Sequence, residues 1–332
     1  MRRALTAFLA IVGVLLALPS AAQTASRQPR AAISHDVRAL KITTLSTMLA
    51  DKGLGEWGYA ALVEVDGHRI LFDTGADPEL VLRNAKVLGI DLSTVTDVVI
   101  SHFHDDHNGG LLPIRLQFAG SNPGALARLH VGKGIMDLRY DPSGKQQNDF
   151  PQIAAAYAAS GGTVAEHDGP FEIYPGVWLT GPVPRHNDES NWSGSLQREG
   201  AEGRVEDNVI EDSSLVIRTK DGLVILTGCG HAGIMNIADF GQLIGQGKPI
   251  LAVIGGLHLF AKSEAVLAAT AVRLKGIRYL LAAHCTGIEA TLRLRELLGL
   301  DRRTAVVAAT GSSFALGKGI DALEIAGPGP GS

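Results

Sequence analysis

Apolar and polar positions along the chain follow a strand pattern first and later alternate between strand and helix patterns. β-Branched and apolar residues alternate or cluster at 40–48, 58–65 and 68–72, and the Asp66-Gly67 pair between the last two segments is typical of a tight hairpin. A further apolar strand is expected at 96–100. From residue 223 onward, expected strands at 223–227, 249–254, 279–283 and 304–307 alternate with expected helices at 232–244, 262–274 and 288–298. The expected fold class is therefore α/β, with helices packed outside β-sheets.

The two ends of the chain lack this regularity. Arg2 and Arg3 precede an uncharged apolar run from residue 4 to 18 and small residues up to Ala22, which is typical of a cleaved signal peptide at 1–22. The run is shorter than the roughly 20 residues that a spanning helix needs, so no stable membrane anchor is expected after cleavage. We expect a flexible leader at 23–37 and a C-terminal tail at 319–332. The expected location is the periplasm or the extracellular medium.

The remaining residues, 38–318, are expected to form one domain. Within it, a stretch of about 120–208 is rich in Gly, Pro, Asn and Ser and has weak periodicity. This composition predicts a loop-rich insert, which we place on the substrate side of the domain.

Charge and histidine content narrow the function. The 332 residues carry 30 Lys and Arg against 34 Asp and Glu, a net charge of −4, and lack a long basic stretch, which argues against a nucleic-acid partner. We expect a small-molecule substrate instead. The chain also contains 11 histidines, and histidine is the commonest metal ligand and the usual proton shuttle near neutral pH. Four of them, His35, His68, His130 and His167, have no special context and are expected to be surface or strand residues.

Ligand-type side chains are densest in SHFHDDHNGG at 101–110, directly after the expected strand at 96–100. An extended stretch that turns into a helix would place His102 and His104 on one side and let Asp106 and His107 reach a neighbouring point. Zinc and other first-row metals take histidine nitrogen and aspartate oxygen. The spacing therefore predicts two adjacent metal sites.

More histidines follow the later strands. Cys229 and His231 come after the strand at 223–227, His258 after the next strand and His284 after the third. The carboxyl ends of strands in open α/β sheets form the edge where ligands bind. These side chains are therefore expected to join the metal site, with His231 a ligand and Cys229 a ligand or a neighbour of one.

The HxHxDH pattern followed by NGG resembles the metallo-β-lactamase superfamily. The segments GCGHAGIMN, IGGLHL and HCTG, with GPVPR upstream, look like the branch of 7,8-dihydropterin-6-methyl-4-(β-D-ribofuranosyl)aminobenzene-5′-phosphate-synthase-like proteins. The resemblance implies a four-layer αββα sandwich with its site at one edge. It also implies that Asp73, at the end of a strand, orders the metal-binding loop. The family's usual third-motif histidine is replaced here by Ile210-Glu211-Asp212, for which His186 is a candidate substitute.

The resemblance divides the ligands between two divalent transition metal ions, zinc first and manganese or iron as alternatives. Asp106 and Asp73 are the carboxylates assigned to catalysis. The ligand sets are His102, His104 and His231 for one ion, and Asp106, His107 and either His258 or His284 for the other.

Two residues have more than one interpretation. Arg185 in the Pro-Val-Pro-Arg loop could bind an anionic substrate or only close the loop through backbone carbonyls. Cys229 and Cys285 could form a disulfide in an oxidising compartment, or stay as thiols beside the ligand histidines.

The expected function is an exported hydrolase that uses a metal-activated water on a small ester, phosphoester or lactone. Two alternatives remain. One is a periplasmic metal-binding protein of the same fold without catalytic activity, which the altered third motif favours. The other is an aspartic protease based on Asp73-Thr74-Gly75, although a second such triplet is missing from the chain.

Overall fold

The computed structural model describes residues 35–189, 194–200 and 202–327. The expected signal peptide at 1–22 and most of the leader lie outside the described residues. Within them, no helix is long and apolar enough to cross a membrane.

The first of two large sheets contains eight strands, with parallel pairing from β4 through β5 and β6 to β8. Its strands in spatial order are β20 (Gly319–Asp321), β19 (Ser313–Ala315), β1 (Leu40–Ser46), β3 (Ala60–Val65), β4 (His68–Phe72), β5 (Asp97–Ile100), β6 (Arg128–Gly132) and β8 (Thr163–His167).

The second sheet contains seven strands, and its parallel part runs from β14 to β17. Its strands in spatial order are β17 (Ala305–Val307), β16 (Tyr279–Ala282), β15 (Ile250–Gly255), β14 (Gly222–Thr227), β13 (Leu215–Thr219), β10 (Val177–Leu179) and β9 (Phe171–Tyr174). Two small sheets pair β12 (Gly203–Glu206), β11 (Gln197–Gly200) and β7 (Arg139–Tyr140), and β18 (Ala309–Thr310) with β2 (Leu49–Ala50).

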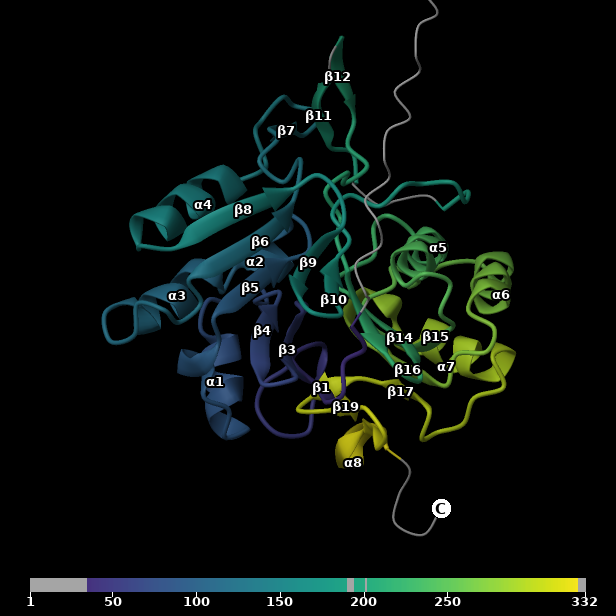
Figure 1. Ribbon diagram of the computed structural model, residues 1–332. Helices are drawn as coiled ribbons and strands as arrows, with labels where there is room; N and C mark the ends of the chain where they lie inside the picture. The colour runs from purple at the N-terminus through teal and green to yellow at the C-terminus, as the bar shows by residue number, and fades with distance from the viewer. Residues whose placement is uncertain (1–34, 190–193, 201, 328–332) are drawn as a thin grey trace, which may run out of the picture. The chain divides into compact units, whose positions relative to one another are not determined.

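Helices cover the outer face of each large sheet (Figure 1). Those on the first sheet are α1 (Leu80–Val87), α3 (Leu111–Ala119) and α4 (Phe150–Ala159), whereas the one-turn helix α2 (Asp105–Asn108) lies in the loop after β5. Those on the second are α5 (Ile234–Ile244), α6 (Glu264–Arg273) and α7 (Ile288–Leu297). The short helix α8 (Leu323–Ala326) follows β20, and single 3₁₀ turns lie at Leu92–Thr94 and His284–Thr286.

Three apolar clusters fill the spaces between these layers. The central cluster joins the two sheets, for example Val63 and Val99 of the first to Ile217 and Leu226 of the second. The other two lie between each sheet and its helices. Strands such as β15, ILAVIG, are covered on both faces and are apolar throughout, as expected for buried parallel strands. The expected four-layer αββα sandwich is therefore confirmed.

The expected loop-rich insert at about 120–208 is wrong where this segment forms strands and a helix of the main domain. The segment supplies β6 and β8 to the first sheet, β9 and β10 to the second, and helix α4. Strands β8 and β9 are the outermost of their sheets, and most of their residues are only partly buried. Edge strands of this kind lack the apolar pattern that predicts a buried strand, which is why the sequence suggested loops.

Both domain boundaries also shift outward. Strand β20 pairs with β19 through Ile320 and Asp321, so the tail does not begin at 319. At the other end, Val37 is buried and its N–H donates to the carbonyl of Arg218 at 2.8 Å, so the ordered chain begins before residue 38.

Candidate metal centre

The candidate ligands follow strands of both sheets. His102, His104, Asp106 and His107 lie after β5 of the first sheet. Cys229 and His231 follow β14, His258 follows β15, and His284 follows β16, all in the second sheet. Parallel neighbours end at the same edge of a sheet, so these loops converge on one place.

His102, His104 and His231 form one group, in which candidate ligand atoms lie within 4.8 Å of one another. Nε2 of His102 is 3.0 Å from Nδ1 of His104. The ring of His231 lies 4.6 Å from that of His102 and 4.8 Å from that of His104, centroid to centroid. Both ring nitrogens of His231 are buried without a hydrogen-bond partner. The structure therefore brings together the three residues expected at the first site.

Asp106, His107 and His284 form a second group under the same 4.8 Å limit. Nε2 of His284 is 3.3 Å from both Nε2 of His107 and Oδ2 of Asp106. The choice left open between His258 and His284 thus falls to His284. His258 packs against His231 instead, with ring centroids 4.7 Å apart.

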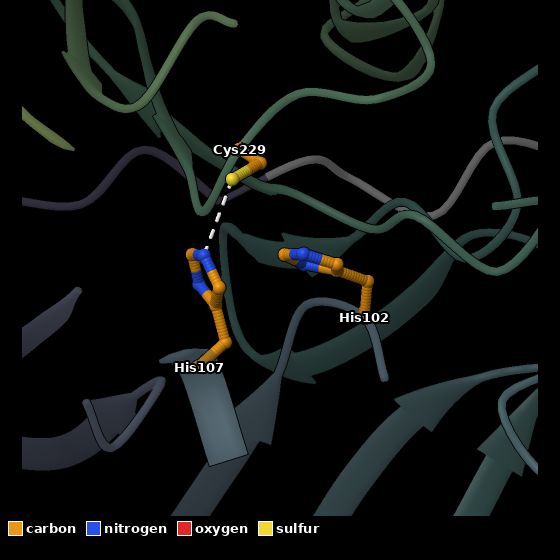
Figure 2. Close-up of side chains that lie close together, drawn as sticks. All are labelled: His102, His107 and Cys229. Carbon is orange, nitrogen blue, oxygen red and sulfur yellow. Dashed lines mark hydrogen bonds between the residues drawn. The ribbon is translucent and has the colours of Figure 1, made fainter. Parts of the chain in front are cut away.

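Cys229 lies between the two groups. Its Sγ is 3.2 Å from Nε2 of His107, and a third set of potential ligand atoms is made by His102, His107 and Cys229. Figure 2 shows the thiol and the His107 imidazole pointing toward one another, with the His102 ring beside them. Cys229 is therefore placed to act as a ligand and is more than a neighbour of one.

Cys285 approaches Cys229 from the strand beyond β15. Both cysteines are free and buried, with their Sγ atoms 3.2 Å apart. A Cβ at Gly256 would lie 2.8 Å from Sγ of Cys285 and 2.1 Å from the carbonyl oxygen of Gly228. The glycine at the end of β15 thus leaves the space in which the two thiols meet. Of the two interpretations, the structure has thiols and not a disulfide.

Asp73 fixes the position of two candidate ligands, one directly and one through Ser101. Its Oδ2 is 2.7 Å from Nδ1 of His107, and its carboxylate accepts the backbone N–H and the hydroxyl of Ser101 at 2.7 and 2.8 Å. Oγ of Ser101 in turn lies 2.8 Å from Nδ1 of His102. Asp73 is fully buried and does not line the metal cavity. These contacts make Asp73 a positioning residue, as the resemblance implied, and its assignment to catalysis stays a prediction.

Burial determines the charge of most of these groups. It lowers the pKa of His102 and His231 well below the usual value and that of His104 to about 3, so their imidazoles are neutral and free to donate a lone pair. Burial would raise the pKa of Asp106, but the charges and hydrogen bonds of His107 and His284 outweigh it and keep Asp106 ionised. For His107, burial is outweighed by Asp106 and Asp73, which raise its pKa to about 9.

Two other expected site residues have structural roles. The guanidinium of Arg185 donates to the carbonyl oxygens of Asn208 and Val209 at 2.6 and 2.8 Å. Of the two interpretations of Arg185, these bonds support loop closure, and substrate binding stays a prediction. His186 is exposed and belongs to none of the ligand groups.

The segment that replaces the third-motif histidine is also structural. Oδ2 of Asp212 accepts the N–H of Ala232 at 2.8 Å, which holds the loop that carries His231. Burial raises the pKa of Asp212 to about 6 and that of Glu211 to about 7. Oε2 of Glu211 pairs with the buried Arg139 at 2.6 Å. His231, and not His186, takes the remaining position beside His102 and His104.

A cavity of about 190 Å³ opens over the cluster. His104, Asp106, Cys229, His231 and His284 line it. Two aromatic residues that were not predicted from the sequence, Trp57 and Phe260, also line the cavity. Trp57 is 50% exposed, and its ring lies 4.8 Å from that of His284. The clue that the sequence offered was a tryptophan just before the start of a strand.

This fold and this arrangement of ligands define a class of protein. The family model of the metallo-β-lactamase superfamily matches residues 58–195 of this chain. Among its relatives is the 7,8-dihydropterin-6-methyl-4-(β-D-ribofuranosyl)-aminobenzene-5′-phosphate synthase of Methanocaldococcus jannaschii. The two are 29% identical over 264 residues, which cover 76% of this chain and 89% of the relative.

Solved structures agree. A protein described as a metal-dependent hydrolase of the β-lactamase superfamily is 28% identical, with a TM-score of 0.65, and the match covers 82% of this chain and 98% of that one. The metallo-β-lactamase-fold protein YhfI of Bacillus subtilis is 13% identical, with a TM-score of 0.53, and covers 84% of this chain and 100% of its own. This second likeness shows the fold alone. The expected superfamily and branch resemblance are confirmed.

Proposed function

We propose that the chain is a metal-dependent hydrolase that holds two divalent transition metal ions, with zinc the first choice and manganese or iron the alternatives. One observation carries the proposal: two triads of ligand-type side chains, His102 with His104 and His231, and Asp106 with His107 and His284, lie side by side. Two-metal hydrolases need such adjacent sites.

The residues present fit such ions. His231 is 2% exposed and both of its ring nitrogens lack a partner, which is costly for a buried polar group unless something binds it. The neutral imidazoles of His102, His104 and His231, a carboxylate and a thiol are donors that zinc takes in proteins, and His107 would release a proton when it binds the ion. Asp73 fixes His107 through Nδ1, as carboxylates commonly do for metal-binding histidines. Cys229 would join the second triad.

The chemistry then divides between the ions and the chain. Bound ions would polarise a carbonyl or phosphoryl oxygen and lower the pKa of a water molecule. The partly exposed carboxylate of Asp106, 24% accessible and ionised, is placed to accept a proton in the cavity. Trp57 and Phe260 give one side of the same cavity an aromatic lining. The substrates that we propose are small esters, phosphoesters or lactones.

The relatives' names differ in activity, since one is a synthase and another a hydrolase. We favour hydrolysis because two adjacent ligand triads are what hydrolysis by a metal-activated water requires. The altered third motif had favoured a metal-binding protein without activity. That argument weakens because His231 completes the first triad. An aspartic protease is disfavoured, because Asp73 contacts Ser101 and His107 and is too buried for a second carboxylate from another copy to reach.

The test combines metal content with a substrate panel. Protein purified without chelators is assayed for metal and for hydrolysis of a phosphodiester, a carboxylic ester, a lactone, a β-lactam and a sulfate ester, with added Zn²⁺, Mn²⁺ or Fe²⁺. We expect about two metal equivalents per chain and hydrolysis of at least one substrate. His104→Ala and His231→Ala should lower activity by at least about 100-fold. His186→Ala, at an exposed histidine outside the cluster, is the control.

Less than one metal equivalent, or full activity in His104→Ala, would contradict the proposal. Uniform inactivity with metal bound would favour the non-catalytic metal-binding protein.

We also propose export to the periplasm or medium, which rests on the sequence of residues 1–22 alone. The mass of the purified mature protein should correspond to a chain that begins at Gln23.

A further inference from the structure

A second cavity of about 260 Å³ lies beside the metal cavity. His231 and His258 line both cavities, so the two are neighbours through these side chains. The second cavity is bounded by the start of α5, the loop that follows β15, and one face of α6.

One side of this cavity is apolar, whereas Asp188 and Glu189 lie elsewhere in its lining. Leu257 and Leu259 are 2% and 3% exposed and form its floor, and Met235 lies at the start of α5. On α6, Ala265 and Ala269 are one helical turn apart, so their small side chains face the same space and leave it open. The cationic side chain in the lining, Lys262, follows His258 on the same loop.

The start of α5 would ordinarily attract an anion, because its first N–H groups have no partner within the helix. Here the carboxylate of Glu189 accepts the N–H groups of Met235 and Asn236, each at 3.0 Å. A Cβ at Gly233 would lie 2.3 Å from Oε2 of Glu189, so the two fit closely. The Glu189 carboxylate thus occupies the start of α5, so a substrate phosphate cannot bind there.

We propose that this cavity binds the acyl group of the substrate, which places the ester or lactone carbonyl at the end near His231 and His258. The inference rests on the proposed function and narrows it, because an apolar wall with an occupied helix terminus suits carboxylic esters and lactones better than phosphoesters. The volume sets the size of the group. At roughly 30 Å³ for each water-sized unit the cavity holds about nine such units, which suits a medium-length acyl chain.

The experiment compares 4-nitrophenyl acetate, butyrate, hexanoate and octanoate on the metal-loaded enzyme. We expect kcat/KM to rise along the series up to hexanoate or octanoate. Ala265→Leu and Ala269→Leu should fill the cavity and lower the ratio of kcat/KM for hexanoate over acetate by at least about tenfold. Val272→Phe is the matched control, since it adds bulk to α6 at a side chain that is 76% exposed and outside the cavity lining.

Calorimetry with sodium octanoate provides a readout that does not depend on turnover. Octanoate should bind the wild type and Val272→Phe, and binding should weaken in Ala265→Leu and Ala269→Leu. Activity with no chain-length preference, or a preference that both filled variants retain, would overturn the inference while leaving the proposed function standing. Octanoate binding that the filled variants lose, together with inactivity on these esters and on the whole substrate panel, would support the cavity and contradict the proposed hydrolase. Thermal melts of each variant confirm that it folds.

Discussion

Asp73 determines much of the metal centre although it does not reach the cavity. Its carboxylate contacts His107 directly and His102 through the hydroxyl of Ser101. Its backbone is in the left-handed region, with φ of 55°, which is uncommon for a residue other than glycine. This backbone conformation costs some stability, and we attribute it to the role of Asp73 in positioning two candidate ligands.

We predict that Asp73→Asn weakens metal binding at the triad of His107. Asparagine still accepts the N–H of Ser101, but it has lost the charge that favours a proton on Nδ1 of His107. The affinity for the second metal equivalent should fall by about 10- to 100-fold, while the fold is retained. Titration with a competing chelator measures it. Asp105→Asn, at an exposed aspartate in the same motif, should bind as the wild type does, and equal affinities in all three proteins would refute the prediction.

Single residues differed in how well the sequence predicted them. His102, His104 and His107 were identified from their spacing because a strand followed by a turn determines where such side chains point. Arg185 was ambiguous for the opposite reason. Its partners are backbone carbonyls, and any residue supplies a carbonyl, so the sequence contains no pattern that distinguishes a loop-closing arginine from one that binds substrate.

At the scale of elements, a polar network links β5, β6 and β8 at one side of the first sheet. Asp97 of β5 is 1% exposed and accepts from His130 of β6 at 3.0 Å and from Arg128 at 2.6 Å. Nδ1 of His130 lies 3.1 Å from Nε2 of His167 at the end of β8. His130 and His167, expected to be surface or strand residues, lie in β6 and β8 and belong to the contacts that hold these strands together.

We predict that Asp97→Asn lowers the free energy of unfolding by about 2 kcal/mol at pH 7, less than for a fully buried pair because Arg128 can regain water. Burial would raise the pKa of Asp97, but hydrogen bonds from His130 and Arg128 outweigh it and hold the pKa below its usual value. Its stabilising effect is therefore complete above about pH 4 and is lost as the pH falls through the native-state pKa.

Urea unfolding of wild type and variant at pH 7, 5 and 2.5 measures this difference. The gap between the two proteins should narrow at the lowest pH. Asp51→Asn, at an exposed aspartate, should show no gap at any pH. A gap for Asp97→Asn that does not change with pH would rule out the ionised carboxylate as its cause.

The position of a strand within its sheet explains how well the sequence predicted it. Central parallel strands such as β14 and β15 were expected within one or two residues because they are buried on both faces and apolar throughout. Strands β8 and β9 were missed because each has a neighbouring strand on one side only and is mostly just partly buried. Their sequences therefore lack the apolar period that marks a buried strand. Strand β20 was missed because three residues at an edge are too few for any pattern.

At the scale of the whole molecule, the ligands come from both sheets. His102, His104, Asp106 and His107 follow a strand of the first, and His231 and His284 follow strands of the second. A metal bound by these residues would therefore link the two halves of the sandwich in addition to the apolar layer between them.

We predict that removing the metal lowers the melting temperature by roughly 10 °C. A ligand present at a thousand times its Kd stabilises the native state by about 4 kcal/mol, and each kcal/mol corresponds to roughly 2–4 °C in a domain of this size. Scanning calorimetry before and after treatment with EDTA measures the change, and re-addition of Zn²⁺ should restore it. His231→Ala should show a smaller difference, and a wild type unaffected by EDTA would contradict the link.

The distance along the chain between the two ligand sets has a further consequence, for folding. His107 and His284 are 177 residues apart in sequence, and His107 and Cys229 are 122 apart. Contacts between such distant residues form late, since a long loop must close first. The HxHxDH segment can meet metal early, but full coordination has to wait for β14 and β16 to join the sandwich. Acquisition of the second ligand set during refolding would therefore mark the last step by which the chain becomes native.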